Sequence, residues 1–145
     1  MKTAIVYFSK HHGNTKKLLD AIAQKNELTL IDVTKKQEIS LEEFDRIGFA
    51  SGIYYGKFAK QLLKFASEHL PADKKIFLIS TYGVVGKHSE DSIRRIIMEK
   101  NCEVIGSYGC LGFDTFGPLK LIGGLHKDRP NEEEIAGAVR FYENL

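Results

Sequence analysis

The stretch MKTAIVYF (residues 1–8) is a short apolar run, and it changes abruptly into the polar stretch SKHHGNT (residues 9–15). The residues from Leu18 to Ala23 then place apolar side chains at the spacing of one helix face. We therefore expect a β-strand, a tight polar loop and an α-helix. This unit decides the fold, because alternating strands and helices build a parallel sheet that is covered by helices.

The polar loop has the composition of an anion-binding site. Backbone N–H groups at the start of a helix, together with the helix dipole, attract phosphate. Gly13 lets the backbone approach the anion, while the hydroxyls of Ser9 and Thr15 and the amide of Asn14 add donors. An ordinary helix cap at Asn14 or Thr15 would explain part of the same pattern. Two other phosphate motifs are excluded, because the loop has neither Gly-x-Gly-x-x-Gly nor a closing Gly-Lys-Ser/Thr.

The composition indicates a single globular domain over residues 1–145, with 43% hydrophobic and 28% charged residues. The net charge is only +2 and the lysines form no stripe, so we expect no nucleic-acid partner. No apolar run is long enough for a membrane span, and the first one meets charge at Lys10, unlike a signal peptide. We expect a cytoplasmic monomer. Cys102 and Cys110 lack metal-binding or CxxC spacing, which favours reduced core cysteines.

The alternation of apolar and helical patterns continues along the chain. A second strand at residues 28–33 is partly alternating, which is typical of a sheet edge. A strand at residues 75–80 is continuously apolar and is expected to be central, whereas one at residues 104–111 is glycine-rich, typical of a bulge or an edge. The remaining predictions are a strand at residues 47–50, helices at residues 58–69 and 89–97, and a last helix capped by Asn131 with Glu134 in a capping box.

Five strands that alternate with helices predict an α/β fold, a three-layer doubly wound sandwich with a five-stranded parallel sheet of order 2-1-3-4-5. In such sheets ligands bind beyond the carboxyl ends of the strands at the topological switch point, here between strands one and three. The loops after strands one, three and four comprise residues 9–15, 51–56 and 81–83. We expect these three loops to form one site.

The second and third of these loops combine glycine with tyrosine, as SGIYYG (residues 51–56) and TYG (residues 81–83). A planar ring stacked between two tyrosines, with a phosphate tail on the first helix, would satisfy all three loops. The glycines would let backbone N–H and C=O groups approach the edge of that ring. Surface packing is the better explanation of each tyrosine taken alone, so the prediction depends on their shared placement.

These motifs resemble those of the flavodoxin family, and the resemblance extends from Lys2 almost to Leu145. The resemblance implies that the protein binds FMN non-covalently and carries single electrons between redox partner proteins. The cofactor-binding residues that it implies are Ser9, Lys10, His11, His12, Gly13, Asn14, Thr15, Ser51, Gly52, Ile53, Tyr54, Tyr55, Gly56, Thr81, Tyr82 and Gly83.

Within this set the resemblance implies separate roles for the phosphate, the two ring faces and the ring edge. They fall to a phosphate-binding group (Ser9, His12, Asn14 and Thr15), a tyrosine on each face (Tyr54 or Tyr55, and Tyr82) and a glycine whose peptide meets the flavin N5 proton (Gly52 or Gly56).

Two features depart from the family. The phosphate loop is one residue longer than the usual Thr-x-Thr-Gly-x-Thr and contains His11 and His12. A phosphate would raise the pKa of a neighbouring histidine and favour its charged form, so binding would weaken as pH rises. A metal at the paired histidines is disfavoured, because no carboxylate or third ligand is nearby. The segment of residues 112–130 is also long, and it would close over the ring, offer a docking surface or pack as a loop.

Two functions fit these residues. An electron carrier needs no catalytic acid, base or nucleophile, because the chemistry belongs to the cofactor. The alternative is a flavin-dependent oxidoreductase of the same fold, of the quinone reductase or protoporphyrinogen oxidase type, with residues 112–130 available to build a substrate pocket. A phosphoacceptor signalling domain is excluded, because it needs acidic residues where this chain has Ser9 and Ser51.

Overall fold

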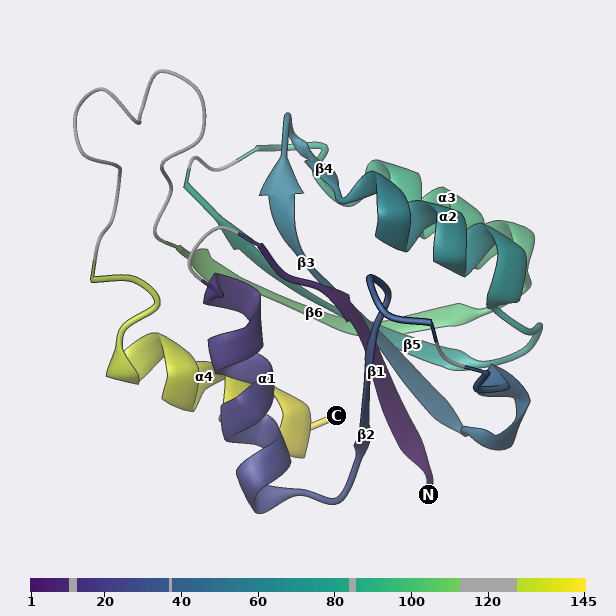
Figure 1. The fold of residues 1–145 in the computed structure, drawn as a ribbon, viewed down its shortest axis with the longest axis horizontal. Coiled ribbons are helices and arrows are strands. Elements are labelled where there is room, and N and C mark those ends of the chain that lie inside the picture. Colours follow the sequence, from purple (N-terminus) through teal and green to yellow (C-terminus); the bar gives the residue numbers. More distant parts are fainter. Residues whose placement is uncertain (11–12, 37, 84–85, 113–127) are drawn as a thin grey trace.

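The computed structural model describes residues 1–10, 13–36, 38–83, 86–112 and 128–145. A parallel sheet forms the middle layer and helices cover both of its faces (Figure 1). The strands are β1 (Thr3–Phe8), β2 (Thr29–Asp32), β3 (Arg46–Tyr54), β4 (Lys57–Phe58), β5 (Lys75–Tyr82) and β6 (Glu103–Leu111). The helices are α1 (Asn14–Lys25), α2 (Lys60–His69), α3 (Asp91–Glu99) and α4 (Glu132–Glu143), with a 3₁₀ helix η1 (Leu41–Glu43) after β2.

The strand order is β2-β1-β3-β5-β6, and the short β4 pairs antiparallel with β3. This confirms the predicted order 2-1-3-4-5, with β4 as an added strand. The register places Phe8 opposite Ser51, and Gly52 opposite Thr81. The carboxyl ends of β1, β3 and β5 therefore lie at one edge of the sheet, as the prediction of a shared site requires.

Two apolar cores lie on the two faces of the sheet. Alternation along β1 sends Ile5 and Tyr7 into the core beneath α1 and α4, and sends Val6 and Phe8 into the core beneath α2 and α3. Every residue of β1 is buried. A strand covered on both faces needs apolar side chains in both directions, which is why the N-terminal run is continuous rather than alternating.

The two outer strands confirm what their sequences predict. The partly alternating β2 lies at one edge and the glycine-rich β6 at the other. The register of β6 shifts by one residue, since Ile76 pairs with Val104 but Phe77 pairs with Gly106. The extra residue forms the expected bulge. The continuously apolar β5 lies between β3 and β6 and is therefore an interior strand.

The capping box of α4 is confirmed. The Asn131 side chain accepts a hydrogen bond from the Glu134 N–H at 2.9 Å, and the Glu134 carboxylate accepts one from the Asn131 N–H at 3.0 Å. These reciprocal bonds satisfy two N–H groups that the first helical turn cannot pair internally.

Two segments predicted as loops are strands. Residues 51–54 continue β3, and a turn at Tyr55 and Gly56 leads into β4, so that residues 51–58 form a β-hairpin. Thr81 and Tyr82 likewise end β5 rather than begin a loop. Phe58 belongs to β4 and not to the following helix. Both strands extend beyond their purely apolar parts because these residues still pair in the sheet, Gly52 with Thr81 and Tyr82 with Leu111.

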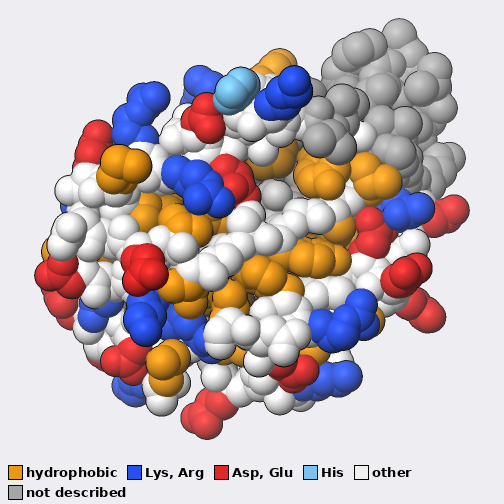
Figure 2. Space-filling model, turned by 180° about the vertical axis from the view of Figure 1, so that it is seen from behind, with side chains coloured by type: hydrophobic (Ala, Val, Ile, Leu, Met, Phe, Trp, Pro, Cys, Tyr) orange, Lys and Arg blue, Asp and Glu red, His pale blue; other side chains and the backbone are white. Residues whose placement is uncertain are grey.

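Charges of both signs are interspersed around the visible face in Figure 2, and apolar side chains gather in a band across its middle. This distribution agrees with the small net charge of +2. In the part of the chain that the structure describes, no helix combines the length and apolar character needed to cross a membrane.

Candidate functional site

The N-terminus of α1 faces the carboxyl edge of the sheet. Gly13 precedes the helix with φ 66°, a left-handed conformation that glycine adopts without strain. The Lys16 N–H donates to the Ser9 hydroxyl at 3.2 Å, and the Lys17 N–H donates to the Gly13 carbonyl at 3.0 Å. The first turn has no acidic residue and no side-chain cap. The positive end of the helix dipole is therefore not neutralised by a carboxylate in that turn.

Thr15 links this helix to the end of β5. Its hydroxyl lies 3.0 Å from the Thr81 hydroxyl, and the two residues are only 1% and 3% exposed. The structure thus joins two residues that the sequence placed in separate loops of one site. A hydroxyl can donate once and accept twice, so this bond leaves both groups able to make a further hydrogen bond.

Gly112 makes room for Asn14 at the same edge. A Cβ at Gly112 would lie 2.7 Å from the Asn14 amide nitrogen, and Asn14 is buried. The Gly112 N–H donates to the Tyr82 carbonyl at 3.0 Å, which holds the end of β6 against the end of β5. Gly112, the first residue of the long segment 112–130, therefore supports two of the predicted site residues, Asn14 and Tyr82.

Tyr54 and Tyr82 point toward opposite edges of the sheet, Tyr54 toward β1 and Tyr82 toward β6. Tyr54 lies edge-to-face against Phe8 of β1, with 5.7 Å between ring centroids, and its hydroxyl occupies the space where a Cβ at Gly52 would be. Tyr82 covers Gly109 of β6, since a Cβ there would lie 3.1 Å from its ring. The carboxyl ends of β3 and β5 lie between them, which leaves the backbone at Gly52 and Thr81 flanked by an aromatic ring on either side.

Tyr55 forms the tip of the hairpin. It is 86% exposed, and both Tyr55 and Gly56 have positive φ, at 51° and 77°. Positive φ at both central residues is the requirement of a type I′ turn, which matches the twist of the two strands that it joins. A non-glycine residue adopts this conformation only at a cost in free energy. The hairpin therefore holds an aromatic ring outward at the same edge as the helix terminus.

Charged and ionisable groups near the site are engaged in the fold. The Lys16 ammonium donates to Asp20 at 2.7 Å, and this bond raises the lysine pKa. Burial, followed by the nearby Asp32 charge, raises the pKa of Tyr7. Cys110, which pairs with Thr81 in the sheet, is buried, and burial raises its pKa to about 12. Each of these three groups is therefore neutral or paired near neutral pH.

The structure brings together most of the predicted site. Ser9, Gly13 and Thr15 converge on the α1 terminus, and the tyrosines flank the ends of β3 and β5. Ser51 is directed to the hairpin instead, because its hydroxyl accepts the Ala59 N–H at 3.0 Å. Ile53 packs against the core beneath α2 and α3. His11, His12 and residues 113–127 of the long segment lie outside the described residues, so their predicted roles stay predictions.

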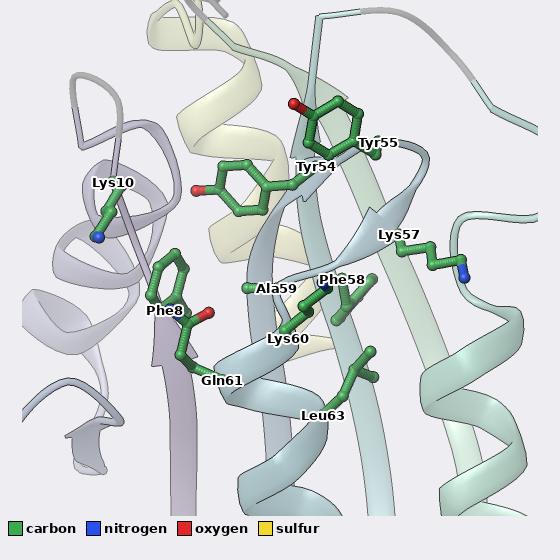
Figure 3. A pocket seen from close by; sticks show the side chains of 10 residues that line it. All are labelled: Phe8, Lys10, Tyr54, Tyr55, Lys57, Phe58, Ala59, Lys60, Gln61 and Leu63. Atoms are coloured by element: carbon green, nitrogen blue, oxygen red, sulfur yellow. The ribbon is translucent and has the colours of Figure 1, made fainter.

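A pocket of about 560 Å³ beside the hairpin was missed by sequence reasoning. Figure 3 shows it between the end of β1, the hairpin and the first turn of α2. The available signal was the pair Tyr55-Gly56 between two apolar residues, Ile53 and Phe58, which is the spacing of a two-residue hairpin. Because the hairpin was not predicted, the sequence did not show which way the side chains of Lys57 and Phe58 point, so neither residue could be assigned to a pocket.

Comparison with known proteins agrees with this geometry. The model of the flavodoxin domain matches residues 4–107. A curated relative, the uncharacterized protein MJ0298 of Methanocaldococcus jannaschii, is 37% identical over 147 residues, covering 100% of this chain and 98% of the relative. The chain belongs to the flavodoxin family.

Solved structures with similar folds share less than a fifth of their sequence with this chain. A flavodoxin from the domain Archaea has a TM-score of 0.68 at 18% identity and covers 96% of this chain and 92% of its own. The Trp repressor binding protein of Bacillus subtilis has a TM-score of 0.71 at 15% identity, with 97% of each chain covered. A Fusobacterium nucleatum flavodoxin bound to flavin mononucleotide has a TM-score of 0.65 at 16% identity, covering 99% and 98%. These likenesses support the flavodoxin-like fold.

Proposed function

We propose that this protein binds FMN at the carboxyl edge of the sheet and transfers single electrons between redox partner proteins. The observation that carries the proposal is the convergence of the α1 terminus with the ends of β3 and β5, where Tyr54 and Tyr82 lean apart. The helix terminus suits a phosphate and the tyrosine-flanked strand ends suit a flat ring, and FMN requires both environments next to each other. Bound FMN would supply the redox chemistry, as it does in other flavoproteins.

The donor set fits the phosphate of FMN. The α1 terminus offers backbone N–H groups and an uncompensated dipole, and the hydroxyls of Ser9 and Thr15 lie beside it. A carboxylate in the first turn would repel a phosphate, and this turn has none. The role of these residues is to bind and orient the phosphate.

Gly56 is the better candidate for the peptide that meets the ring edge. Gly52 lies inside the ladder between β3 and β5, opposite Thr81, and Tyr54 covers its Cα. Gly56 lies in the exposed turn at φ 77°, where a glycine peptide can change direction at little cost. The hairpin would then hold the ring with the Tyr55–Gly56 backbone while the strands keep water from its inner face.

The pocket beside the hairpin favours a second function, an FMN-dependent oxidoreductase that acts on a small molecule. Its aromatic lining includes Tyr54, which also borders the proposed flavin site. A carrier has no need of such a pocket, whereas an enzyme must hold its substrate near the ring.

The test begins with FMN and riboflavin titrated into the purified flavin-free chain. We expect FMN to bind at least about tenfold more tightly, because only FMN carries the phosphate that the α1 terminus would hold. Equal affinities would contradict the phosphate site, and failure of both ligands to bind would contradict the cofactor. Stepwise anaerobic reduction then separates the functions, since two resolved one-electron steps support a carrier and a single two-electron step supports the oxidoreductase.

A further inference from the structure

The pocket beside the hairpin has the size and lining of a small-molecule site. Its volume of about 560 Å³ falls within the usual range of such sites, about 300–1,000 Å³. The apolar wall is formed mainly by aromatic rings, and the charged groups are all lysines, while Tyr55 and Gln61 add a hydroxyl and an amide (Figure 3). The apolar lining residues are Phe8, Tyr54, Phe58, Ala59 and Leu63, and the lysines are Lys10, Lys57 and Lys60.

This pocket adjoins the proposed flavin site but has a largely different set of lining residues. Phe8, Phe58 and Ala59 belong to the core beneath α2 and α3, whereas α1 and its phosphate-binding terminus lie on the other face of the sheet (Figure 1). Thr15 and Tyr82 do not line the pocket. Lys10, Tyr54 and Tyr55 line the pocket and also belong to the predicted cofactor-binding residues, so the two sites share one border.

The aromatic wall suits a flat ligand. The rings of Phe8 and Tyr54 meet edge-to-face at an interplanar angle of 87°, so they form two perpendicular walls of one corner. An aromatic ligand placed in that corner would contact the face of one ring and the edge of the other, both of which are favourable geometries. Phe58 and Leu63 continue the apolar surface toward α2.

The charge at the rim has one sign. None of the ten described lining residues is acidic, and none of the ion pairs between described residues includes Lys10, Lys57 or Lys60. The Lys10 ammonium lies 5.5 Å from the centre of the Phe8 ring, directly over the apolar wall.

The start of α2 adds to this positive potential. Lys60 is the first residue of α2, whose first turn has no acidic residue and no side-chain cap. Lysine at a helix N-terminus is opposed by the helix dipole. An anion bound in the pocket would relieve this repulsion.

We infer that this pocket binds a small aromatic organic anion, whose ring lies against Phe8, Tyr54 and Phe58 and whose negative group lies at Lys57 and Lys60. The apolar wall alone would accept a neutral aromatic molecule, and the lysines alone would accept any anion. The pocket combines both requirements within one small-molecule volume. This inference goes beyond FMN binding, because Lys57, Phe58 and Lys60 are not among the predicted FMN-binding residues.

A pair of isosteric probes tests both requirements. 1-Naphthoate and 1-naphthamide share one aromatic skeleton and differ in a carboxylate against a neutral carboxamide. Isothermal titration calorimetry would measure each probe against the full chain, first without FMN and then saturated with it. We expect saturable binding of one 1-naphthoate per chain, about tenfold tighter than 1-naphthamide, and equal affinity in both flavin states.

The variant Lys57→Gln/Lys60→Gln removes the two charges at exposed positions that do not support the core. It should weaken 1-naphthoate about tenfold and change 1-naphthamide by less than about twofold. Lys64→Gln, one turn further along α2 and outside the lining, is the matched control and should leave both affinities unchanged. Leu63→Gln, which places an amide in the apolar wall, should weaken both probes.

Three results would overturn the inference. Equal affinity for the two probes would show that the lysines do not select an anion, and absence of binding would show that the pocket is not a site. Competition between 1-naphthoate and FMN would show that the pocket is part of the flavin site. Failure of FMN to bind, with 1-naphthoate still bound at one per chain, would contradict the proposed function and leave the pocket as inferred.

Discussion

A single buried contact connects the phosphate loop to the ring-binding edge. Thr15 and Thr81 are 66 residues apart in sequence, yet their hydroxyls lie 3.0 Å apart. Thr15 therefore has a structural role in addition to its proposed contact with phosphate. The two roles predict different responses to mutation, and the difference can be measured.

Thr15→Val removes the hydroxyl with little change in shape. We expect stability to fall by about 1–3 kcal/mol, because the Thr81 hydroxyl loses a buried partner. FMN affinity should also fall, while riboflavin affinity should change by less than about twofold, since riboflavin has no phosphate. Urea unfolding and flavin titration would measure the two effects. If Thr15→Val weakens riboflavin as much as it weakens FMN, Thr15 acts through the fold and not on the phosphate.

Tyr82 is the second residue whose role can be isolated. Tyr82 ends β5, and its ring lies against Gly109 of β6, on the opposite side of the proposed ring site from Tyr54. Tyr82→Ala should weaken FMN binding by about 1–3 kcal/mol, the scale of a buried aromatic contact. Fluorescence titration of FMN measures this loss, and Tyr82→Phe, which keeps the ring, should bind FMN within about twofold of the native chain. A native dissociation constant in Tyr82→Ala would exclude the stacking role.

The sequence predicted which residues of the phosphate loop would form the site, but it did not predict which residues they would contact. Ser9, Gly13 and Thr15 are chemically suited to phosphate, and the strand–loop–helix pattern places them at one helix terminus. The bond from Thr15 to Thr81 depends on the lateral distance between α1 and β5, which no local pattern encodes. The Lys16–Asp20 pair differs, because its two residues are four apart on one helix, a spacing at which opposite charges meet.

At the scale of elements, the β3–β4 hairpin is the main departure from prediction. Glycine and tyrosine together suggested a loop over residues 51–56, but β3 continues to Tyr54 because β5 pairs with it as far as Gly52 and β4 pairs with its end. Type I′ turns favour Asn-Gly, and Tyr-Gly is a weaker signal of the same turn. The hairpin was therefore concealed by its unusual first turn residue.

Replacing Tyr55 should therefore have opposite effects on the stability of the fold and on FMN affinity. Tyr55 has φ 51° and is 86% exposed, so the fold tolerates strain without burying the ring. Tyr55→Asn should raise stability by about 0.4–1 kcal/mol, because asparagine tolerates this conformation better. FMN affinity should fall if the ring contacts the flavin. Thermal unfolding and FMN titration would test this, with Tyr55→Phe as the control that keeps the ring. Reduced stability in Tyr55→Asn would contradict the account of strain.

At the scale of the whole molecule, topology was more predictable than the site. Crossovers between parallel strands are right-handed and short, so alternating strands and helices allow few arrangements. The edge positions of β2 and β6 followed from their weaker apolar patterns. The pocket was not predictable, because its lining residues come from β1, the hairpin and α2, and only the packed fold brings them together.

The contact between α4 and β6 buries two ionisable groups, so the free energy of unfolding should depend on pH in alkaline solution. Burial, followed by the neighbouring Cys110 and Glu134, raises the pKa of Tyr108 from 10.0 to about 12. Burial, followed by Glu134, raises the pKa of Cys110 from 9.0 to about 12. The Tyr108 hydroxyl donates to the Glu134 carbonyl at 2.8 Å, a bond that its ionisation would remove. Both groups are therefore held in their neutral forms by the folded state.

The folded chain should accordingly lose stability as the solution becomes alkaline. The unfolded state releases these two protons from about pH 9 upward, whereas the folded state retains them until about pH 12, so the free energy of unfolding falls across this window. Urea unfolding measured from about pH 8 to about pH 11 would give the slope, and the variant Tyr108→Phe/Cys110→Ala should reduce it, because neither new side chain titrates. The variant will be less stable at neutral pH, since the hydrogen bond to Glu134 is lost, but the slope does not depend on that offset. Parallel curves for the two proteins would show that these groups ionise equally in the folded and unfolded states.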